Sequence, residues 1–492
     1  MTGRPAGRYD RSVETTPETL SPAVHGVGTA PLRPLRVGLV SVRFSLFDPQ
    51  LPADFPDRMR THARRSEETL ARHFEVLSTG VIEDEAGAVQ AAQRLAGDRL
   101  DAVVFAPAMA APPSYADIAL RDCTAPLVIW NAPAISDLGT DLDQATATEH
   151  STTVGAVMYA NVLVRRAQPA QVVTAAHGDD PAVDRLIRTV RAVAAAGALR
   201  GATVLRVGDP IPGYLDVEAD EADLARLGMR EHAVSLEEWE ATVSNIGQEA
   251  AATFLEGLTA RGWRGDAGPS AAQSARVALA LETLLARTGA ACGTVNCHGS
   301  WFRRSSAVGV VACLGVACQT LAGRPLACTG DAPTGILMYL CRRMAGAALY
   351  SECYAPDLAS GLMLVAGGGE GDPAWADDGG VMLTANAHYP GQLGAGSSID
   401  YRVRLGPATL LSLSPAADGW VLAWAPGEVV ESRYRRMRGP NAMFRFDSGA
   451  IDDATSRWIA SGATHHNALA PGRLDVEAPA LAAALGIREV RV

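Results

Sequence analysis

Carboxylate side chains in two apolar settings are the first residues of this sequence that could carry out acid–base or metal chemistry. Asp331 precedes a proline and opens an apolar helical run, which is typical either of a helix N-cap or of a carboxylate that binds a metal ion or a substrate hydroxyl. Glu352 lies within Tyr350-Ser-Glu-Cys-Tyr354, where a bare carboxylate would cost several kcal/mol to bury. Glu352 is therefore the strongest single candidate, with an arginine ion pair as the structural alternative.

Histidines follow two of the expected elements and could join these carboxylates. His298 comes directly after the expected buried strand 292–297, so it could face a cleft at the carboxyl end of a sheet or simply satisfy the strand end. His465 and His466 follow an expected helix at 453–461. Because adjacent imidazoles point in different directions, we expect at most one of the pair to bind a ligand, and both could be solvated.

Several classes of chemistry are excluded or disfavoured by composition. The 492 residues include no lysine, so all 43 basic residues are arginine and neither a Schiff base nor a Walker A lysine can form. The net charge of −11 disfavours binding to nucleic acid or anionic membranes. The glycine-rich stretch 366–371 is not followed by a helix with dinucleotide-binding spacing. No Gly-x-Ser-x-Gly or His-Glu-x-x-His motif supports a hydrolase or a metalloprotease.

The elements that must position these residues alternate between short apolar runs and helical stretches. This alternation predicts an α/β fold with two Rossmann-like parallel-sheet units, followed by a small antiparallel β-barrel. The expected strands are 36–42, 100–106, 126–130, 170–176 (opening the second unit), 202–207, 292–297, 401–405, 409–413 and 420–424. The expected divisions are a disordered tail at 1–33, α/β domains at 34–168 and 169–355, and a barrel-like domain with closing helices at 356–492.

Cysteine spacing and the absence of long apolar runs indicate in which cellular compartment the protein is expected. Seven of the eight cysteines fall between residues 292 and 353, without a Cys-x-x-Cys pair, which indicates buried free thiols. No run of 18 uncharged apolar residues predicts a membrane span, and the first 33 residues lack the apolar core of a signal peptide. We therefore expect a cytoplasmic protein without a membrane partner.

The order of several motifs resembles one known family. Gly309-Val-Val-Ala-Cys313 and Gly323-Arg-Pro-Leu-Ala-Cys-Thr-Gly-Asp331 are followed by the strand glutamate Glu352, a barrel-like segment and Gly462-Ala-Thr-His-His466. This ordered set resembles the L-fucose isomerase / L-arabinose isomerase superfamily over residues 35–492. Each motif is moderately specific, and their order carries more weight than any one of them.

The resemblance implies an aldose–ketose isomerase that works through an enediol on a small sugar-like substrate. It implies a divalent cation, usually Mn²⁺, that holds substrate oxygens, and a homotrimer or homohexamer. Glu352 and Asp331 are then the expected catalytic residues, and together with His466 they are the expected metal ligands. The implied substrate-binding residues are His298, Thr329, His388 and His465.

Two departures from the family pattern degrade the implied metal site. Thr329 stands where the family has a glutamate, and Gly367–Gly369 covers a stretch where many members have a histidine. An alternative is therefore a diverged homologue that lacks isomerase activity and binds or transforms a sugar-like metabolite in a specialised pathway. A third class, an exported two-lobed sugar-binding protein, is disfavoured by the missing signal peptide and the barrel-like C-terminus.

Overall fold

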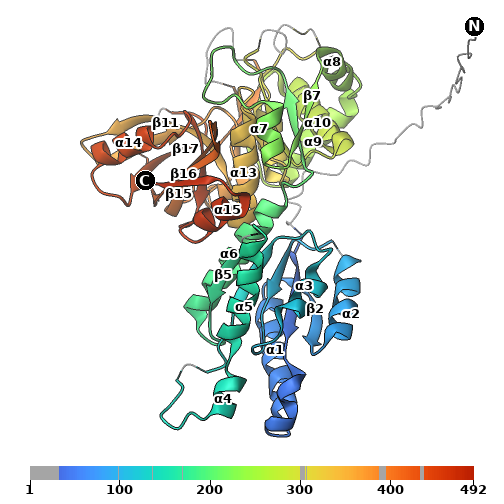
Figure 1. Ribbon diagram of the computed structural model, residues 1–492. Helices are drawn as coiled ribbons and strands as arrows, with labels where there is room; N and C mark the ends of the chain where they lie inside the picture. The colour runs from blue at the N-terminus through green and yellow to red at the C-terminus, as the bar shows by residue number, and fades with distance from the viewer. Residues whose placement is uncertain are drawn as a thin grey trace, which may run out of the picture.

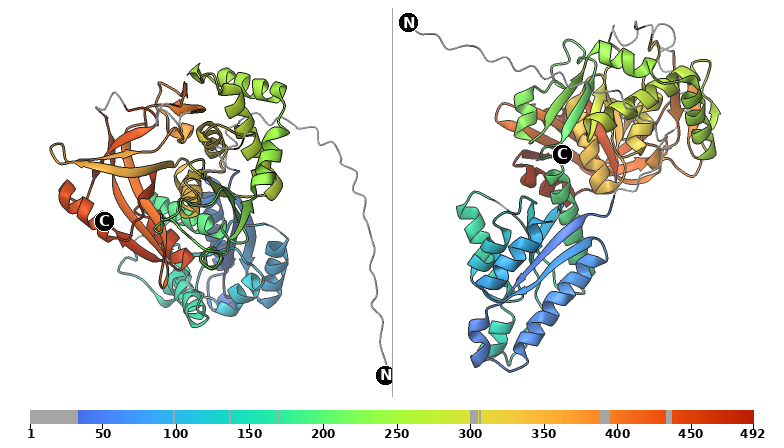
Figure 2. Two further views of the ribbon diagram at one scale, coloured as in Figure 1. Left: turned by 90° about the horizontal axis from the view of Figure 1, so that it is seen from above. Right: turned by 90° about the vertical axis from the view of Figure 1, so that its right-hand side faces the viewer.

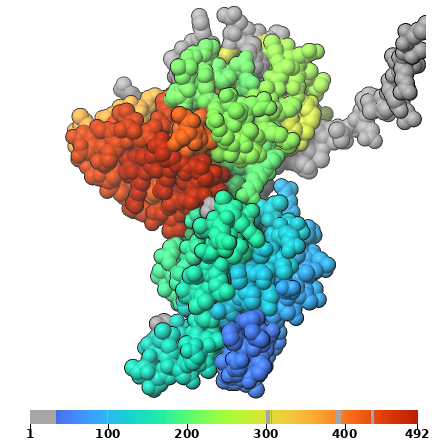
Figure 3. All heavy atoms as spheres, viewed as in Figure 1, coloured from blue at the N-terminus to red at the C-terminus, as the bar shows by residue number. Residues whose placement is uncertain are grey.

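The structure is a computed structural model that describes residues 33–97, 99–135, 137–168, 170–299, 305, 307–386, 395–432 and 437–492. The chain forms two lobes, with the N-terminal domain below the rest in the view of Figure 1. Figure 3 shows a narrow waist between these lobes. Within the described ranges, no helix is both long enough and apolar enough to cross a membrane.

The N-terminal domain is a five-stranded parallel sheet with strand order β2-β1-β3-β4-β5. Its central strands are buried almost throughout, which explains their continuous apolar sequences. The strands are β1 (Arg36–Val42), β2 (Glu75–Ile82), β3 (Ala102–Phe105), β4 (Leu127–Asn131) and β5 (Gln171–Thr174). The helices are α1 (Phe55–Ala71), α2 (Glu85–Ala96), α3 (Pro113–Leu120), α4 (Gln144–Glu149) and α5 (Thr152–Arg165).

The second domain is built on a four-stranded parallel sheet with order β10-β9-β6-β7. Helix α6 (Asp180–Gly197) lies between the two lobes in Figure 1 and contacts both β4 and α13. The strands are β6 (Thr203–Val207), β7 (Arg230–Val234), β9 (Cys292–Val295) and β10 (Leu326–Cys328). The other helices are α7 (Glu221–Arg226), α8 (Leu236–Ser244), α9 (Gln248–Ala260), α10 (Ala271–Thr288), α12 (Cys313–Leu321) and α13 (Ala332–Ala345).

The C-terminal domain is a closed six-stranded antiparallel barrel. Its strands follow the order β15-β18-β11-β12-β17-β16, and β16 pairs back onto β15 to close the ring. The strands are β11 (Leu349–Asp357), β12 (Leu362–Ala366), β15 (Gly406–Ala416), β16 (Gly419–Val430), β17 (Asn441–Phe446) and β18 (His466–Pro471), with β19 (Arg488–Arg491) added parallel to β16. The accompanying helices are α14 (Ile451–Ala460) and α15 (Glu477–Leu485).

A short sheet of three strands joins the second domain to the barrel region. It contains β8 (Arg264–Asp266), β13 (Met382–Ala385) and β14 (Ser397–Asp400). The barrel lies beside the second domain, as the view from above in Figure 2 shows, and α13 packs directly on β15 and β18. The predicted fold class, two parallel-sheet units followed by an antiparallel barrel, is confirmed.

Three local expectations differ from the observed elements. Strand β5 was expected to open the second domain, but it pairs with β4 as the edge of the first sheet. The expected boundary between residues 355 and 356 cuts β11, which belongs wholly to the barrel sheet. The expected strand 401–405 is reduced to a single bridge between Val403 and Ala376. The apolar content of a segment predicts a buried strand but does not say which strand it pairs with. Sheet membership is defined by that pairing.

The cysteine prediction is confirmed. All eight cysteines have free thiols, and six of them are buried. Burial raises the pKa of the Cys292 and Cys341 thiols to about 12, which keeps them protonated and inert at neutral pH.

A buried histidine pair occupies the N-terminal domain at the carboxyl end of its sheet. The rings of His62 and His177 meet edge to face with centroids 4.9 Å apart, and the His177 ring also contacts the Trp130 indole. Burial lowers the pKa of both imidazoles to about 4; mutual repulsion further lowers that of His62, and the Arg65 charge lowers both.

We expect this pair to make the N-terminal domain sensitive to acid. An unfolded histidine titrates near 6.5, so its stabilising contribution is complete above that pH. As the pH falls from 6.5 toward 4 the unfolded state binds protons that the folded state excludes, so stability is lost. For His62 the loss is on the order of 3 kcal/mol. Chemical denaturation of wild type and His62→Gln at several pH values measures it, and the variant is expected to show a flatter pH profile.

The matched control is His232→Gln, because the side chain of His232 is 41% exposed. This control should retain the wild-type pH slope. Identical slopes in wild type and His62→Gln would contradict the prediction.

Candidate functional site

A cavity of about 270 Å³ lies where the second domain meets the barrel. Strands β9 and β10 end beside it, which is the edge of a parallel sheet where ligands commonly bind. Strands β11 and β18 of the barrel form the opposite wall. The cavity is lined by Ile211, Tyr214, Cys297, His298, Val311, Cys313, Cys328, Thr329, Tyr350, Glu352, Gly368, Gly369, Glu370, Asn386, His465 and His466.

Glu352 and His466 are brought together by strand register. They are 114 positions apart in sequence but stand directly opposite each other in the antiparallel pair β11–β18. The Glu352 Oε1 atom lies 3.9 Å from His466 Nε2. The convergence expected from the sequence is therefore present, with an imidazole rather than an arginine beside the carboxylate.

Asp331 contacts the His466 nitrogen that faces away from the cavity. Its Oδ1 atom accepts a hydrogen bond from the Thr334 backbone N–H, which makes Asp331 the N-cap of α13. Its Oδ2 atom lies 2.9 Å from His466 Nδ1, and both side chains are fully buried. The carboxylate accepts a hydrogen bond from the Nδ1–H group. In the neutral imidazole, Nε2 therefore carries the lone pair, and it faces the cavity.

In this structure Asp331 reaches the cavity through His466, and its expected direct catalytic and ligand roles stay predictions. Both carboxylate oxygens are engaged within the protein, and Asp331 is not part of the cavity wall. The N-cap alternative is confirmed, and the same side chain also orients the imidazole. A buried carboxylate behind a histidine in this way fixes the tautomer and the orientation of the ring.

The environment of Glu352 favours its protonated form. Burial raises the pKa of the Glu352 carboxyl above its ordinary value, while the imidazoles of His466 and His465 oppose this rise. A carboxyl group with a raised pKa is suited to giving and taking protons near neutral pH. Beside the lone pair of His466 Nε2, it completes a pair of groups that could move a proton on a bound molecule.

Glu370 is a site residue that sequence reasoning missed. Its side chain is buried, lines the cavity and accepts a hydrogen bond from the Gly368 backbone N–H. A Cβ atom at Gly368 would lie 2.6 Å from Glu370 Oε2, and one at Gly369 would lie 2.2 Å from Ser398 Oγ. The glycine run makes room for this carboxylate, and the glutamate directly after it is the sequence signal that could have identified the residue.

Thr329 has an unusual backbone conformation at the cavity wall. Its φ angle is +61°, in the left-handed region that a β-branched residue rarely adopts. The next residue, Gly330, has φ +86°, and a Cβ atom there would lie 2.5 Å from the Pro210 Cα. The turn from β10 into α13 therefore stores strain directly beside the cavity.

The remaining predicted residues divide between the cavity and the undescribed part of the chain. His298 and His465 both line the cavity. His465 Nδ1 lies 2.6 Å from Asp216 Oδ2, so this imidazole is held by the second domain. Burial pushes the pKa of Asp216 upward, but hydrogen bonds from His465 bring it below its ordinary value. His388 lies outside the described residues.

Three cysteines contribute to the apolar part of the wall, together with aliphatic and aromatic side chains. The cysteines are Cys297, Cys313 and Cys328. Burial, followed by the nearby Glu370 charge, raises the pKa of the Cys313 and Cys328 thiols well above the ordinary value. The protonated thiols act as small apolar groups, which does not favour a thiolate nucleophile.

A metal centre made of protein ligands is not evident in the described ranges. Among these residues, no group of three or more His, Cys, Asp or Glu side chains is arranged to hold a metal ion. Of the three predicted ligands, Glu352 and His466 face the cavity and Asp331 is engaged internally. The manganese prediction stays a prediction.

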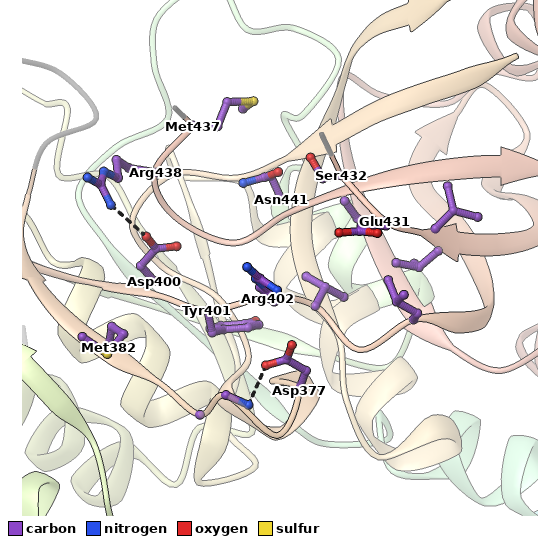
Figure 4. A pocket seen from close by; sticks show the side chains of 17 residues that line it. Asp377, Met382, Asp400, Tyr401, Arg402, Glu431, Ser432, Met437, Arg438 and Asn441 are labelled. Atoms are coloured by element: carbon purple, nitrogen blue, oxygen red, sulfur yellow. Dashed lines mark hydrogen bonds and ion pairs between the residues drawn. The ribbon is translucent and has the colours of Figure 1, made fainter. Parts of the chain in front are cut away.

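A second cavity, of about 500 Å³, lies between the short sheet and the barrel. Figure 4 shows its lining, in which Arg438 faces Asp400 at 3.8 Å and Asp377 accepts a hydrogen bond from the Gly379 backbone. Its described lining offers no imidazole, and its charged groups are spread over the wall. The smaller cavity is therefore the better candidate for catalysis.

Comparison with known proteins leaves the family open. No family model matches the chain, and no curated protein does. One solved structure that matches is a solute-binding protein of an ABC transporter from Burkholderia multivorans. It is 15% identical, covers 63% of this chain and 93% of its own, and has a TM-score of 0.16. A likeness this distant carries no argument about function.

Removing the strain at Thr329 should stabilise the protein. We expect Thr329→Gly to raise the free energy of unfolding by about 1 kcal/mol, because glycine adopts a positive φ without steric cost. Thr329→Ala is the matched control, since it also removes the hydroxyl but keeps the strained backbone. Denaturant titration measures both, and equal stabilities of the two variants would contradict the strain argument.

Asp331→Asn should keep the helix cap but change the tautomer of His466. Asparagine is as good an N-cap as aspartate, but its amide N–H would donate to Nδ1 and move the imidazole proton to Nε2. ¹⁵N chemical shifts of the imidazole nitrogens measure this change. Asp331→Ala serves as the comparison that also loses the cap, at a further cost of about 1 kcal/mol. An unchanged tautomer in Asp331→Asn would contradict the proposed hydrogen-bond direction.

Proposed function

We propose that the cavity catalyses proton transfer on a small sugar-like molecule, in the manner of an aldose–ketose isomerase. The observation that carries the proposal is the arrangement Asp331–His466–Glu352. One buried carboxylate fixes an imidazole, whose free nitrogen faces a second carboxyl group of raised pKa across 3.9 Å. Such a pair can both remove and return a proton, as an enediol mechanism requires.

The reaction can be written with the chain's own groups. The base, His466 Nε2 or ionised Glu352, removes the proton at C2 of an aldose, and the C–H electrons form the C1–C2 double bond of an enediol. The aldehyde oxygen gains a proton from the partner group. The O2 proton then leaves and a proton is added at C1, which yields a ketone at C2 and a hydroxymethyl group at C1. Each step leaves the pair ready to reverse roles.

The size and polarity of the cavity support a compact polyhydroxylated ligand. Its volume of about 270 Å³ is at or below the range of about 300–1,000 Å³ common for drug-sized ligands. Its walls combine acceptors such as Glu370 with groups that can also donate, such as Asn386 and His298. Several convergent polar groups in a small pocket suit a molecule with a hydroxyl on almost every carbon.

The resemblance to sugar isomerases implies a divalent cation, but no step above depends on it. Glu352 and His466 are the predicted ligands that face the cavity, because both Asp331 oxygens are engaged and Thr329 is neutral. A cation bound at these two groups would polarise substrate oxygens. Homo-oligomerisation is likewise part of the resemblance and remains a prediction.

A diverged homologue is the second candidate function. Thr329 and the run Gly367–Gly369 replace residues that the resemblance expects at the metal site. In this reading the cavity binds or transforms a sugar-like metabolite by chemistry other than isomerisation. The strained backbone at Thr329 fits a site that has been reshaped.

Solvent deuterium exchange tests the proposed proton transfer directly. Purified protein is incubated in D₂O with a panel of pentoses, hexoses and deoxyhexoses, with and without Mn²⁺, and NMR follows the label at C1 and C2. We expect exchange with at least one sugar, and a loss of about 10²-fold or more in rate for Glu352→Gln and for His466→Asn. The matched control Glu256→Gln replaces an exposed glutamate on α9 and should exchange at the wild-type rate.

The outcomes separate the two functions. Saturable sugar binding without exchange in any condition would favour the diverged homologue over the isomerase. Exchange that survives in both Glu352→Gln and His466→Asn would overturn the assignment of these residues.

A further inference from the structure

A third cavity, an open cleft of about 560 Å³, lies at the junction of the two lobes, outside the candidate catalytic cavity. It is bordered by the amino ends of strands in the first sheet, by the end of α6 and by α13. Five arginines line it: Arg33, Arg36, Arg99, Arg200 and Arg343. One carboxylate, Asp101, shares the lining. Such a concentration of positive charge is notable in a chain of net charge −11.

Internal partners neutralise only part of this charge. Asp101 accepts two hydrogen bonds from the Arg33 guanidinium and one from the Arg36 backbone N–H. The Arg36 side chain pairs with Glu75, beyond the cleft lining. The carbonyl groups that end α6 offset a further ~0.5 elementary charge. Among the described residues, the five guanidinium charges less those of Asp101, Glu75 and the helix end leave about 2.5 positive charges at the cleft.

Arg343 shows that the cleft is a shaped site rather than a solvated surface. Its side chain is only 16% exposed, and its closest carboxylate contact, Asp101, is 3.8 Å away. Its Nε atom is buried without a hydrogen-bond partner among the described residues. The guanidinium also lies over the Tyr339 ring, 5.5 Å from its centroid. A largely buried guanidinium whose donors are not all used by the protein can donate hydrogen bonds to a bound anion.

The charged groups come from both lobes. Arg33, Arg36 and Arg99 belong to the N-terminal domain, where they precede or begin strands β1 and β3. Arg200 follows α6, and Arg343 projects from α13 of the second domain. An anion bound between them would contact both lobes at once and link them at the waist seen in Figure 3.

We propose that this cleft binds a compact anion with two or more phosphate groups. Several guanidinium groups around one anion match the charge and the multiple acceptor oxygens of a diphosphate better than those of a single carboxylate. Leu100 and Pro126 add an apolar border, which leaves room for an organic group beside the phosphates. The proposal does not depend on the isomerase chemistry.

Calorimetric titration of the full chain with inorganic phosphate, inorganic diphosphate and a nucleoside diphosphate tests it. We expect diphosphate to bind at least tenfold more tightly than phosphate, and binding to weaken as salt is raised. Comparable affinity for both diphosphates would identify the inorganic group as the recognised part. Tighter binding of the nucleoside diphosphate would show that the organic group is also recognised.

Variants locate the binding. Arg99→Ala, at an exposed position, and Arg343→Ala should each weaken diphosphate binding about tenfold or more. Arg165→Ala removes an exposed arginine of α5 that does not line the cleft, and should change affinity less than twofold. Ligand-induced stabilisation followed by thermal unfolding gives a second readout that confirms each variant is folded. No diphosphate binding at low salt, or binding unchanged in both Arg99→Ala and Arg343→Ala, would overturn the proposal.

Discussion

The hydrogen bond between Asp331 and His466 connects the local start of a helix to the geometry of the candidate site. One oxygen of the carboxylate caps α13, and the other holds the imidazole. Because α13 belongs to the second domain and His466 opens a barrel strand, this bond also joins two domains. In a fully buried position, a charge-assisted bond of this kind is strong and costly to break. The direction of His466 Nε2, and thus the chemistry open to the cavity, depends on it.

The cavity combines a rigid wall with a strained one. The barrel side places Glu352 opposite His466 through strand register, which leaves little freedom for either backbone. On the other side, the turn from β10 into α13 passes through two residues of positive φ, Thr329 and Gly330. Strain of this kind persists only where surrounding contacts hold it, and it is commonly found at functional sites. Glu370, packed among glycines, adds a second carboxylate to the cavity wall beside Glu352.

The two candidate sites of the molecule lie at different domain junctions. The candidate catalytic cavity lies between the second domain and the barrel, whereas the arginine cleft lies between the N-terminal domain and the second domain. Helix α6 contacts strands of the first sheet as well as α13, so it is common to both junctions. The second domain contributes residues to the walls of both sites.

Sequence alone determined the alternation of buried strands and helices, the barrel-like C-terminus and the free thiols, because these follow from local apolar patterns. It also singled out Glu352 as a site candidate, because burying a charged carboxylate is costly. It also offered the N-cap as one of two interpretations of Asp331, since that role is read from the next few residues. It could not assign β5 to the first sheet, because that depends on which distant strand lies alongside. Glu370 follows its glycine run directly in the sequence, but its place in the cavity wall is decided by the fold. Only the tertiary structure decided that His466, rather than His465, receives the buried carboxylate and faces Glu352. Both imidazoles line the cavity, with ring centroids 3.8 Å apart, but the strand register that sets Glu352 opposite His466 is fixed by pairing across 114 positions of chain.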